Sequence, residues 1–307
     1  MTKIIASLRR YSKIINVAEI KLTFEVEKKI RAIAPELLHL ARQNGRHVTV
    51  HQINYLSQGL SIRGFIVIPR TNRRLPVIVF NRGGGGRFGS LTSASVFCLL
   101  STMARWGYIV FASQYRGGLG SQGKDEIGGS DLNDVLNLYP IIKSHPYSDI
   151  KRIGIFGGSR GGMMAYLMLK ARVDWIKAVV NVAGMANLVR DVKSFRVEMK
   201  EYYGKILGGG LKELKNRSAI YWTHKFPKNV PILLMHGSSD WRVNPEDSID
   251  LSKEFLKHKI PHRLVIFEGA DHEISEFKEE SLEMAKSWFH KYVRDLSPLP
   301  KLKPHGD

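Results

Sequence analysis

The spacing of apolar residues divides the chain into strand-like and helix-like segments. Residues 48–55 alternate between apolar and polar side chains, and the turn signal Gln58-Gly59 separates them from a second such stretch at residues 61–69. We therefore expect an antiparallel hairpin there. A short continuous apolar run, typical of a strand covered on both faces, follows at residues 76–80. Further strands, mostly apolar, are expected at residues 108–112, 151–156, 176–183, 231–237 and 263–267.

Helix-like segments separate these apolar runs. They cover residues 93–105, 131–143, 160–172, 246–257 and 279–293. Strands that alternate with helices in this way indicate an α/β protein, with a mostly parallel central sheet and helices on both faces. In such sheets, binding sites lie beyond the carboxyl ends of the strands.

We expect one catalytic domain between two peripheral segments. Residues 1–45 are interpreted as a basic, helical N-terminal extension that Pro35 divides, packing on the domain rather than on a membrane surface. Residues 46–295 are the expected catalytic domain. Within it, residues 186–229 lose the alternating pattern and are too long for a plain loop, which indicates a cap-like excursion. The proline-rich residues 296–307 are expected to be a flexible tail.

The composition is that of a globular protein. Of the 307 residues, 43% are hydrophobic, and the single cysteine, Cys98, excludes an intrachain disulfide. The first residues lack the apolar core of a secretory signal, and no apolar run reaches the roughly 20 residues of a membrane span. We therefore expect a cytoplasmic protein without a stable membrane anchor.

The chain is strongly basic, with 47 Lys and Arg against 28 Asp and Glu and a net charge of +19. Such a charge attracts nucleic acid, anionic membranes or acidic substrates. The basic residues are spread over the whole length, however, and no recognisable nucleic-acid-binding motif accompanies them. A solvated basic surface is therefore favoured over a specific nucleic-acid site, whose affinity would fall steeply with salt.

The candidate nucleophile lies where the strand-like run before residue 159 meets a helix-like run. Ser159 stands in a Gly-x-Ser-x-Gly pattern, which marks the sharp strand-to-helix turn that carries the nucleophile in the α/β-hydrolase fold. Gly157 and Gly161 lack a Cβ and so relieve the crowding of such a turn. For this motif alone, a glycine-rich turn without catalysis is the alternative.

A serine hydroxyl needs a base to take its proton and an acid to orient that base. In this fold the order along the chain is Ser, then Asp or Glu, then His. Asp240 and His272 each follow a predicted strand, in the required order. His236 lies inside or at the end of a strand and is more easily explained as structural. Asp271 would point away from His272, and Asp247 begins a helix, where capping explains it. No usual metal-ligand spacing appears, so neither a metal nor a cofactor is expected.

Two glycine-rich loops follow predicted strands near this site. Arg82-Gly83-Gly84 opens the first, directly after residues 76–80, where hydrolases of this fold take one backbone N–H for the oxyanion. A flexible loop is the alternative. We expect the backbone N–H of Arg160 and one from Gly83 or Gly84 to form the oxyanion hole. The candidate substrate-binding side chains are Arg82, Tyr115, Trp241, Tyr203 and Trp222.

Several runs share their spacing with a known family. They are Tyr115-Arg116-Gly117-Gly118, Asp131-x-x-Asp134, Lys151 to Gly162, His236-Gly237-x-x-Asp240-x-Arg242-Val243 and Gly269-x-x-His272. Over roughly residues 48–293 the chain therefore resembles the catalytic domain of prolyl-oligopeptidase-type serine peptidases. The resemblance implies Ser159 as nucleophile, His272 as general base and then acid, and Asp240 as the orienting acid.

The chain departs from that family in two respects. Many members carry a β-propeller that restricts the site to peptides, and the N-terminal segment here is too short to be one. Some members use a tyrosine of the first glycine loop as an oxyanion donor, and this chain has Arg82 in the corresponding region. A serine hydrolase is therefore a firmer prediction than a peptidase.

The sequence predicts hydrolysis through an acyl-enzyme. Short peptides or aminoacyl amides are the first substrate class, as the resemblance implies. Acyl esters are the alternative, because an open site needs only an activated acyl group. A hydrolase fold that has lost catalysis and serves as a binding module is a further alternative, although this sequence keeps all three candidate residues.

Overall fold

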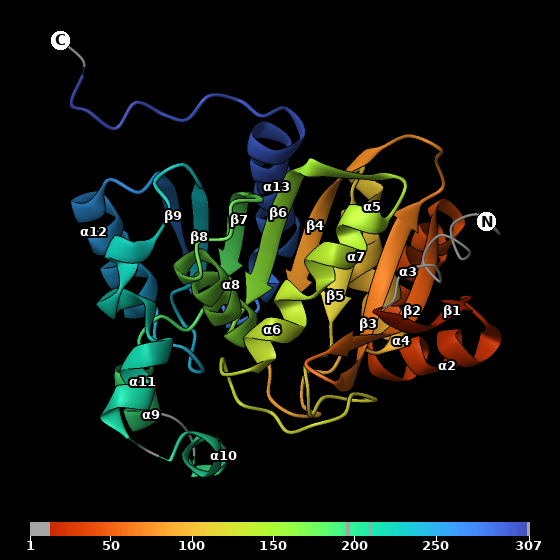
Figure 1. Cartoon of the computed structure of the whole chain (residues 1–307), viewed down its shortest axis with the longest axis horizontal. Coiled ribbons are helices and arrows are strands. Elements are labelled where there is room, and N and C mark those ends of the chain that lie inside the picture. The colour runs from red at the N-terminus through yellow and green to blue at the C-terminus, as the bar shows by residue number, and fades with distance from the viewer. Residues whose placement is uncertain (1–12, 195–196, 209, 306–307) are drawn as a thin grey trace. The chain divides into compact units, whose positions relative to one another are not determined.

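The computed structural model describes residues 13–194, 197–208 and 210–305, and the chain forms two compact units, Met1–Ile153 and Gly154–Asp307. Figure 1 labels the elements of both units. Each unit combines strands with helices that pack on them, and this confirms the predicted α/β class.

The first unit is built on a mixed sheet. Its strands are β1 (Ile14–Ile20), β2 (Val48–Ser57), β3 (Leu60–Pro69), β4 (Leu75–Asn81) and β5 (Ile109–Ser113), in the order β1-β2-β3-β5-β4. Of the strand pairs in this series, β4 and β5 run parallel and the other three run antiparallel. The predicted hairpin is confirmed, because β2 and β3 pair antiparallel across Gln58 and Gly59, whose φ angles are 49° and 80°. A turn with two positive φ values matches the right-handed twist of the strands.

The start of the first unit corrects a prediction. Residues Ile14–Ile20 form a strand, and Val17 lies opposite Ile53 of β2. The prediction of helix over residues 1–45 is therefore wrong for this stretch. Four of its seven residues are isoleucine or valine, whose branched side chains pack well on a pleated surface next to β2. Residues 1–12 of that prediction lie outside the described residues.

The remainder of the N-terminal segment is helical, and Pro35 divides it as predicted. The helix α2 (Phe24–Ile33) ends before Pro35, which begins the short helix η1 (Pro35–Leu37), and α3 (Leu38–His47) follows. The helices predicted at residues 93–105 and 131–143 are also confirmed. They consist of α4 (Ser93–Ser95), η2 (Val96–Leu100), α5 (Ser101–Arg105), α6 (Asp131–Leu136) and α7 (Leu138–Ser144).

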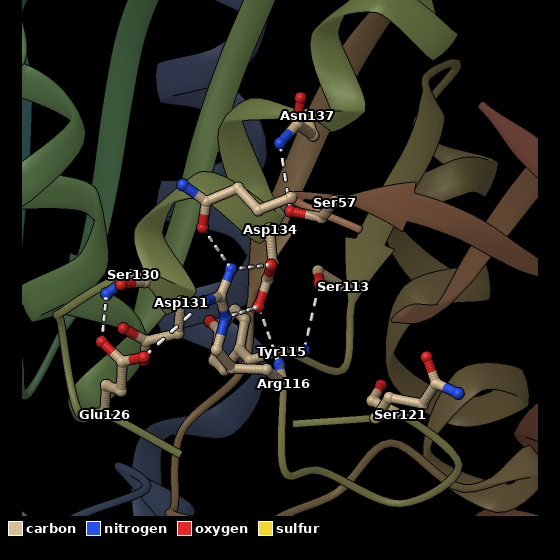
Figure 2. Close-up of polar contacts among 12 residues, drawn as sticks. Ser57, Ser113, Tyr115, Arg116, Ser121, Glu126, Ser130, Asp131, Asp134 and Asn137 are labelled. Carbon is tan, nitrogen blue, oxygen red and sulfur yellow. Dashed lines mark hydrogen bonds and ion pairs between the residues drawn. The ribbon is translucent and has the colours of Figure 1, made fainter. Parts of the chain in front are cut away.

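A buried ion pair holds the glycine-rich loop that follows β5 (Figure 2). The guanidinium of Arg116 donates to both carboxylate oxygens of Asp134, at 2.9 and 3.1 Å, and the backbone N–H of Arg116 donates to the same carboxylate at 2.8 Å. Gln58 accepts a further hydrogen bond from Arg116 at 2.7 Å. Glu126 lies 3.6 Å from the guanidinium. The loop is thereby fastened to α6 and to the β2–β3 turn.

The second unit begins within β6 (Ser148–Gly158) and contains the other parallel strands. They are β7 (Ile176–Val182), β8 (Ile232–Gly237) and β9 (His262–Phe267), and β7, β8 and β9 lie side by side in this order. The helices that pack on these strands are α8 (Arg160–Lys170), α12 (Glu246–His258) and α13 (Lys278–Phe289), followed by η6 (His290–Arg294). Figure 1 shows α8 in front of the strands and α13 behind them. The strands and helices predicted for residues 151–183 and 231–293 are thus confirmed.

Between β7 and β8 the chain leaves the sheet. This stretch contains α9 (Leu188–Ser194), α10 (Val197–Leu207), α11 (Leu211–Arg217), η3 (Ala219–Tyr221) and η4 (Thr223–Lys225). The assignment of residues 186–229 to a cap, and of residues 46–295 to one catalytic domain, stays a prediction. Residues 296–305 form neither helix nor strand. Among the residues that the structure describes, no helix has the length and apolar character to cross a membrane.

Candidate active site

The strand β6 and the helix α8 meet at Ser159. This residue has φ 56° and ψ −124°, outside the region that side chains normally allow, and α8 begins at the next residue. Strain of about 1–3 kcal/mol at a single residue is typical of functional turns. The backbone N–H of Ser159 donates to the carbonyl of Val182 at 2.9 Å, which holds the turn against the end of β7.

The glycines around Ser159 are required by close packing. A Cβ on Gly157 would collide with the backbone of Gly161, and a Cβ on Gly162 would collide with the side chain of Asn181 and with Gly184. The contact at Gly157 bears out the expectation that glycine relieves crowding in this turn, while the same expectation for Gly161 stays a prediction. By contrast, a Cβ on Gly158 would meet only the carbonyl oxygen of Val182, at an ordinary 3.7 Å.

The carboxylate of Asp240 is held by four donors just after β8. Its Oδ1 accepts from the backbone N–H groups of Arg242 and Val243 at 2.7 and 3.1 Å. Its Oδ2 lies 2.6 Å from Nδ1 of His272 and 3.0 Å from Nε2 of His236. Burial opposes ionisation, but the hydrogen bonds from the two histidines outweigh it and hold the pKa of Asp240 well below its usual value. Asp240 is therefore an anion at neutral pH.

The loop after β9 carries His272 to this carboxylate. The backbone N–H groups of Ser238 and Ser239 donate to the carbonyls of Phe267 and Ala270, at 2.8 and 3.0 Å, which joins the loops after β8 and β9. Gly237 lies so close to Ala270 and Asp271 that a Cβ would collide with both of their carbonyl oxygens. The two strand ends therefore fix the distance between Asp240 and His272.

The pairing with Asp240 leaves the other ring nitrogen of His272 as the basic one. Because the anionic carboxylate only accepts, Nδ1 carries the proton and Nε2 has the lone pair. The side chain of His272 is 10% exposed, so the ring is nearly enclosed but reachable. In the described part of the chain Ser159 Oγ makes no hydrogen bond, and such bonds are often long in the absence of a substrate.

The two glycine-rich segments of the predicted oxyanion hole belong to different units. The N–H of Arg160 belongs to the first turn of α8, where backbone donors lack acceptors within the helix. In the first unit, the buried guanidinium of Arg82 donates to the backbone carbonyls of Gln114, Gly83 and Gly86, at 2.8 to 3.0 Å. It thereby shapes the loop that contains Gly83 and Gly84. The assignment of these backbone groups to an oxyanion hole stays a prediction.

Comparison with known proteins identifies the family. Residues 94–295 match the model of the prolyl oligopeptidase family, which is about two thirds of the chain. The chain belongs to this family. The uncharacterized peptidase YtmA of Bacillus subtilis is 28% identical over 216 residues, which cover 69% of this chain and 81% of that protein. Dipeptidyl-peptidase 5 of Porphyromonas gingivalis is 27% identical over 231 residues, covering 70% of this chain and 33% of that protein.

A solved structure shows the same fold. The acylaminoacyl peptidase of Pyrococcus horikoshii superposes with a TM-score of 0.71 at 18% identity, over 86% of this chain and 45% of that one. The chain thus has the α/β-hydrolase fold of a catalytic domain in this family of serine-type peptidases, and it spans about a third of the length of dipeptidyl-peptidase 5.

In this member of the prolyl oligopeptidase family, most candidate substrate-binding side chains make structural contacts. The hydroxyl of Tyr115 donates to the carbonyl of Arg82 at 3.1 Å. Trp222 is buried and donates to the carbonyl of Lys215 at 3.0 Å, while the buried Tyr203 contacts Met185. Trp241 differs because it is 52% exposed. Their contact with a substrate stays a prediction for all of them, Arg82 included.

The residue whose contact with the site the sequence did not predict is His236. Its position before Gly237 indicated only a structural role, yet its Nε2 touches the carboxylate of Asp240. His236 and Asp240 are four residues apart, one before and one after the end of β8. This spacing alone does not predict a hydrogen bond between them. The His-Gly-x-x-Asp run was the available signal, but it did not say which atoms meet.

No group of three or more His, Cys, Asp or Glu side chains within the described ranges is arranged to hold a metal ion.

Asp271, which the sequence predicted to point away from His272, accepts hydrogen bonds from Glu273 and Ser275 at 2.9 Å. Asp247 accepts from the backbone N–H groups of Ala186 and Asn187.

Proposed function

We propose that this protein is a serine peptidase that cleaves short peptides or aminoacyl amides through an acyl-enzyme. Ser159 is the nucleophile, His272 the general base and then acid, and Asp240 the acid that orients His272. The observation that carries the proposal is the 2.6 Å contact between Asp240 Oδ2 and His272 Nδ1, which directs the basic Nε2 away from the acid. The strained backbone of Ser159 supports it.

The proposed reaction follows from these roles. Ser159 Oγ attacks the carbonyl carbon of the substrate while its proton passes to His272 Nε2. The N–H of Arg160 and one from Gly83 or Gly84 stabilise the oxyanion. The C–N bond then breaks, and His272 gives the proton to the leaving nitrogen. Water, deprotonated by His272, hydrolyses the acyl-Ser159 ester and restores the serine.

An amide substrate is favoured over an ester by two features. The relatives' names include a dipeptidyl-peptidase and an acylaminoacyl peptidase, both of which act on bonds to nitrogen. The contact of Asp240 with Nδ1 also orients His272 as a proton donor, which amide cleavage needs because the leaving nitrogen must be protonated. Esters leave more easily and depend less on this acid.

A matched panel of aminoacyl anilides and short-chain acyl esters tests the proposal, with Ser159→Ala as the control. We expect anilide cleavage by the parent protein and its loss in Ser159→Ala. Ester cleavage alone would replace the peptidase by an esterase that uses the same residues. Activity that persists in Ser159→Ala would contradict the whole assignment.

We further propose that the protein works in the cytoplasm. Its single cysteine, Cys98, allows no intrachain disulfide, which fits a reducing compartment. Fractionation of cells that express the full chain tests this proposal, and recovery outside the cytoplasmic fraction would contradict it.

A further inference from the structure

A second histidine contacts the same carboxylate oxygen as His272. Nε2 of His236, on β8, lies 3.0 Å from Asp240 Oδ2, and Nδ1 of His272 lies 2.6 Å from it. His236 is fully buried, and so is the side chain of Asp240. Nearby bulk water therefore does not compete for this contact, and the geometry of the pair is determined by the protein.

The surroundings of His236 determine which of its nitrogens carries the proton. Nε2 faces two groups that only accept, the carboxylate of Asp240 and the carbonyl oxygen of Val243, which lies at 3.2 Å. Nε2 is therefore the donor. Nδ1 lies 2.7 Å from Oγ of Ser248, at the start of α12, and a serine hydroxyl can donate to a ring nitrogen that has a lone pair. The contacts at Nδ1 and at Nε2 therefore indicate the same tautomer of His236, with the proton on Nε2.

We propose that His236 is a positioning residue for the Asp240–His272 pair. Its Nε2–H holds Oδ2, while the backbone N–H groups of Arg242 and Val243 hold Oδ1, so the carboxylate cannot rotate away from His272. The inference rests on the proposed function, in which His272 takes the proton of Ser159.

The shared oxygen has an electrostatic consequence as well. Because Oδ2 divides its charge between two donors, it attracts a protonated His272 less strongly than it would with one donor. Asp247, on α12 beside Ser248, is a second carboxylate whose charge acts on His236, and the neighbouring Asp271 interacts in the same way with His272. Removal of the His236 donor should therefore loosen the carboxylate and, at the same time, favour the protonated form of His272.

The test is the rate at which a fluorophosphonate modifies the protein between pH 5 and 9. This probe reacts with an activated serine and needs no knowledge of the natural substrate. In His236→Leu we expect the maximal rate to fall roughly tenfold, and the midpoint of the acidic limb to rise by about 0.5 in pH. His236→Gln, whose amide nitrogen can take the place of Nε2, should restore most of both. Ser248→Ala should show the same changes as His236→Leu, but smaller.

A role in packing alone predicts a different result. The inference is overturned if His236→Leu melts cooperatively and its modification rate has the same maximum and the same acidic midpoint on the pH axis as that of the parent protein. If His236→Leu does not fold, the decision falls to Ser248→Ala, and an unchanged limb in that variant would overturn it equally. Modification that persists in Ser159→Ala would instead refute the proposed function. If Ser159→Ala is not modified but His236→Leu keeps the rate and pH dependence of the parent protein, only the role of His236 is refuted.

Discussion

At the scale of single residues, the site depends on groups whose hydrogen-bonding roles are fixed. Asp240 accepts at both oxygens, and its anionic form requires a proton on Nδ1 of His272. Nε2 of His272, which faces away from Asp240, is then the basic nitrogen. This arrangement of proton positions follows from the contacts of one carboxylate, so small changes to it should affect catalysis more than folding.

Replacement of Asp240 by asparagine tests this point. The asparagine amide can donate to Nδ1 and so place the proton of His272 on Nε2, where it can no longer accept from Ser159. We expect kcat for an acyl ester to fall by about 10³–10⁴ with little change in KM. The matched control is Asp271→Asn on the neighbouring loop, whose carboxylate binds Glu273 and Ser275 instead. Equal losses in both variants would contradict the role of Asp240.

At the scale of elements, close backbone packing at strand ends determines where the reactive groups stand. The turn from β6 to α8 needs glycine at residues 157 and 162, and the end of β8 needs it at Gly237. In the first unit an ion pair fastens the loop after β5 to α6, and close packing also requires glycine at Gly117 and Gly118 of that loop. Both devices hold irregular backbone in one conformation.

Alanine substitutions in the turn from β6 to α8 test whether steric crowding, rather than mere position in the turn, requires glycine. Gly157→Ala should lower the free energy of unfolding by about 2 kcal/mol or more, because the new Cβ displaces the backbone of Gly161. Gly158→Ala is the adjacent control, with open contact distance, and should change stability little. Urea denaturation measures both. Equal stability of Gly157→Ala and Gly158→Ala would show that crowding at residue 157 does not determine the turn.

Removal of the buried acid of the first unit should be costly. Asp134→Ala leaves the guanidinium of Arg116, only 6% exposed, without its main partner. We expect a loss of about 3 kcal/mol in unfolding free energy. Asp295→Ala breaks the pair of Asp295 with Arg294, which is about half exposed, and should cost little. A loss in Asp134→Ala no larger than in Asp295→Ala would show that the ion pair does not stabilise the loop.

The positions of the candidate residues were predictable from the sequence because they stand at strand ends, where chain order and turn chemistry are informative, while their catalytic roles stay a prediction. Ser159, Asp240 and His272 follow their strands in the order that the fold requires. The strand β1 was not predictable, since its seven residues have no turn signal and gain their stability from β2, which begins only at Val48. The contact of His236 with Asp240 likewise depends on the path of the chain after β8, which the sequence pattern does not specify.

At the scale of the whole molecule, buried histidines link stability to pH. His145 is buried near His51, and burial first, then the charge of His51, lowers its pKa from 6.5 to about 4. Below pH 6.5 the unfolded chain binds a proton that the folded chain takes up only near pH 4. Stability conferred by neutral His145 is therefore complete above pH 6.5 and is lost as the pH falls towards 4.

Acid sensitivity should accordingly depend on this residue. Between pH 7 and pH 5 the free energy of unfolding should fall by about 2 kcal/mol on account of His145. His145→Phe, which keeps an aromatic ring against Phe111, should remove that part of the loss, whereas His39→Gln at an exposed position should not. Urea titrations at the two pH values provide the measurement. If His145→Phe loses as much unfolding free energy between pH 7 and pH 5 as the parent protein, His145 is not the cause of the acid sensitivity.

The most direct test of the proposed chemistry is to locate the modified residue by mass spectrometry after reaction with a fluorophosphonate. We expect one adduct, on Ser159, which disappears in Ser159→Ala and forms far more slowly in His272→Ala. An adduct on another residue with Ser159 unmodified, or modification at the same rate in His272→Ala, would contradict the proposed chemistry.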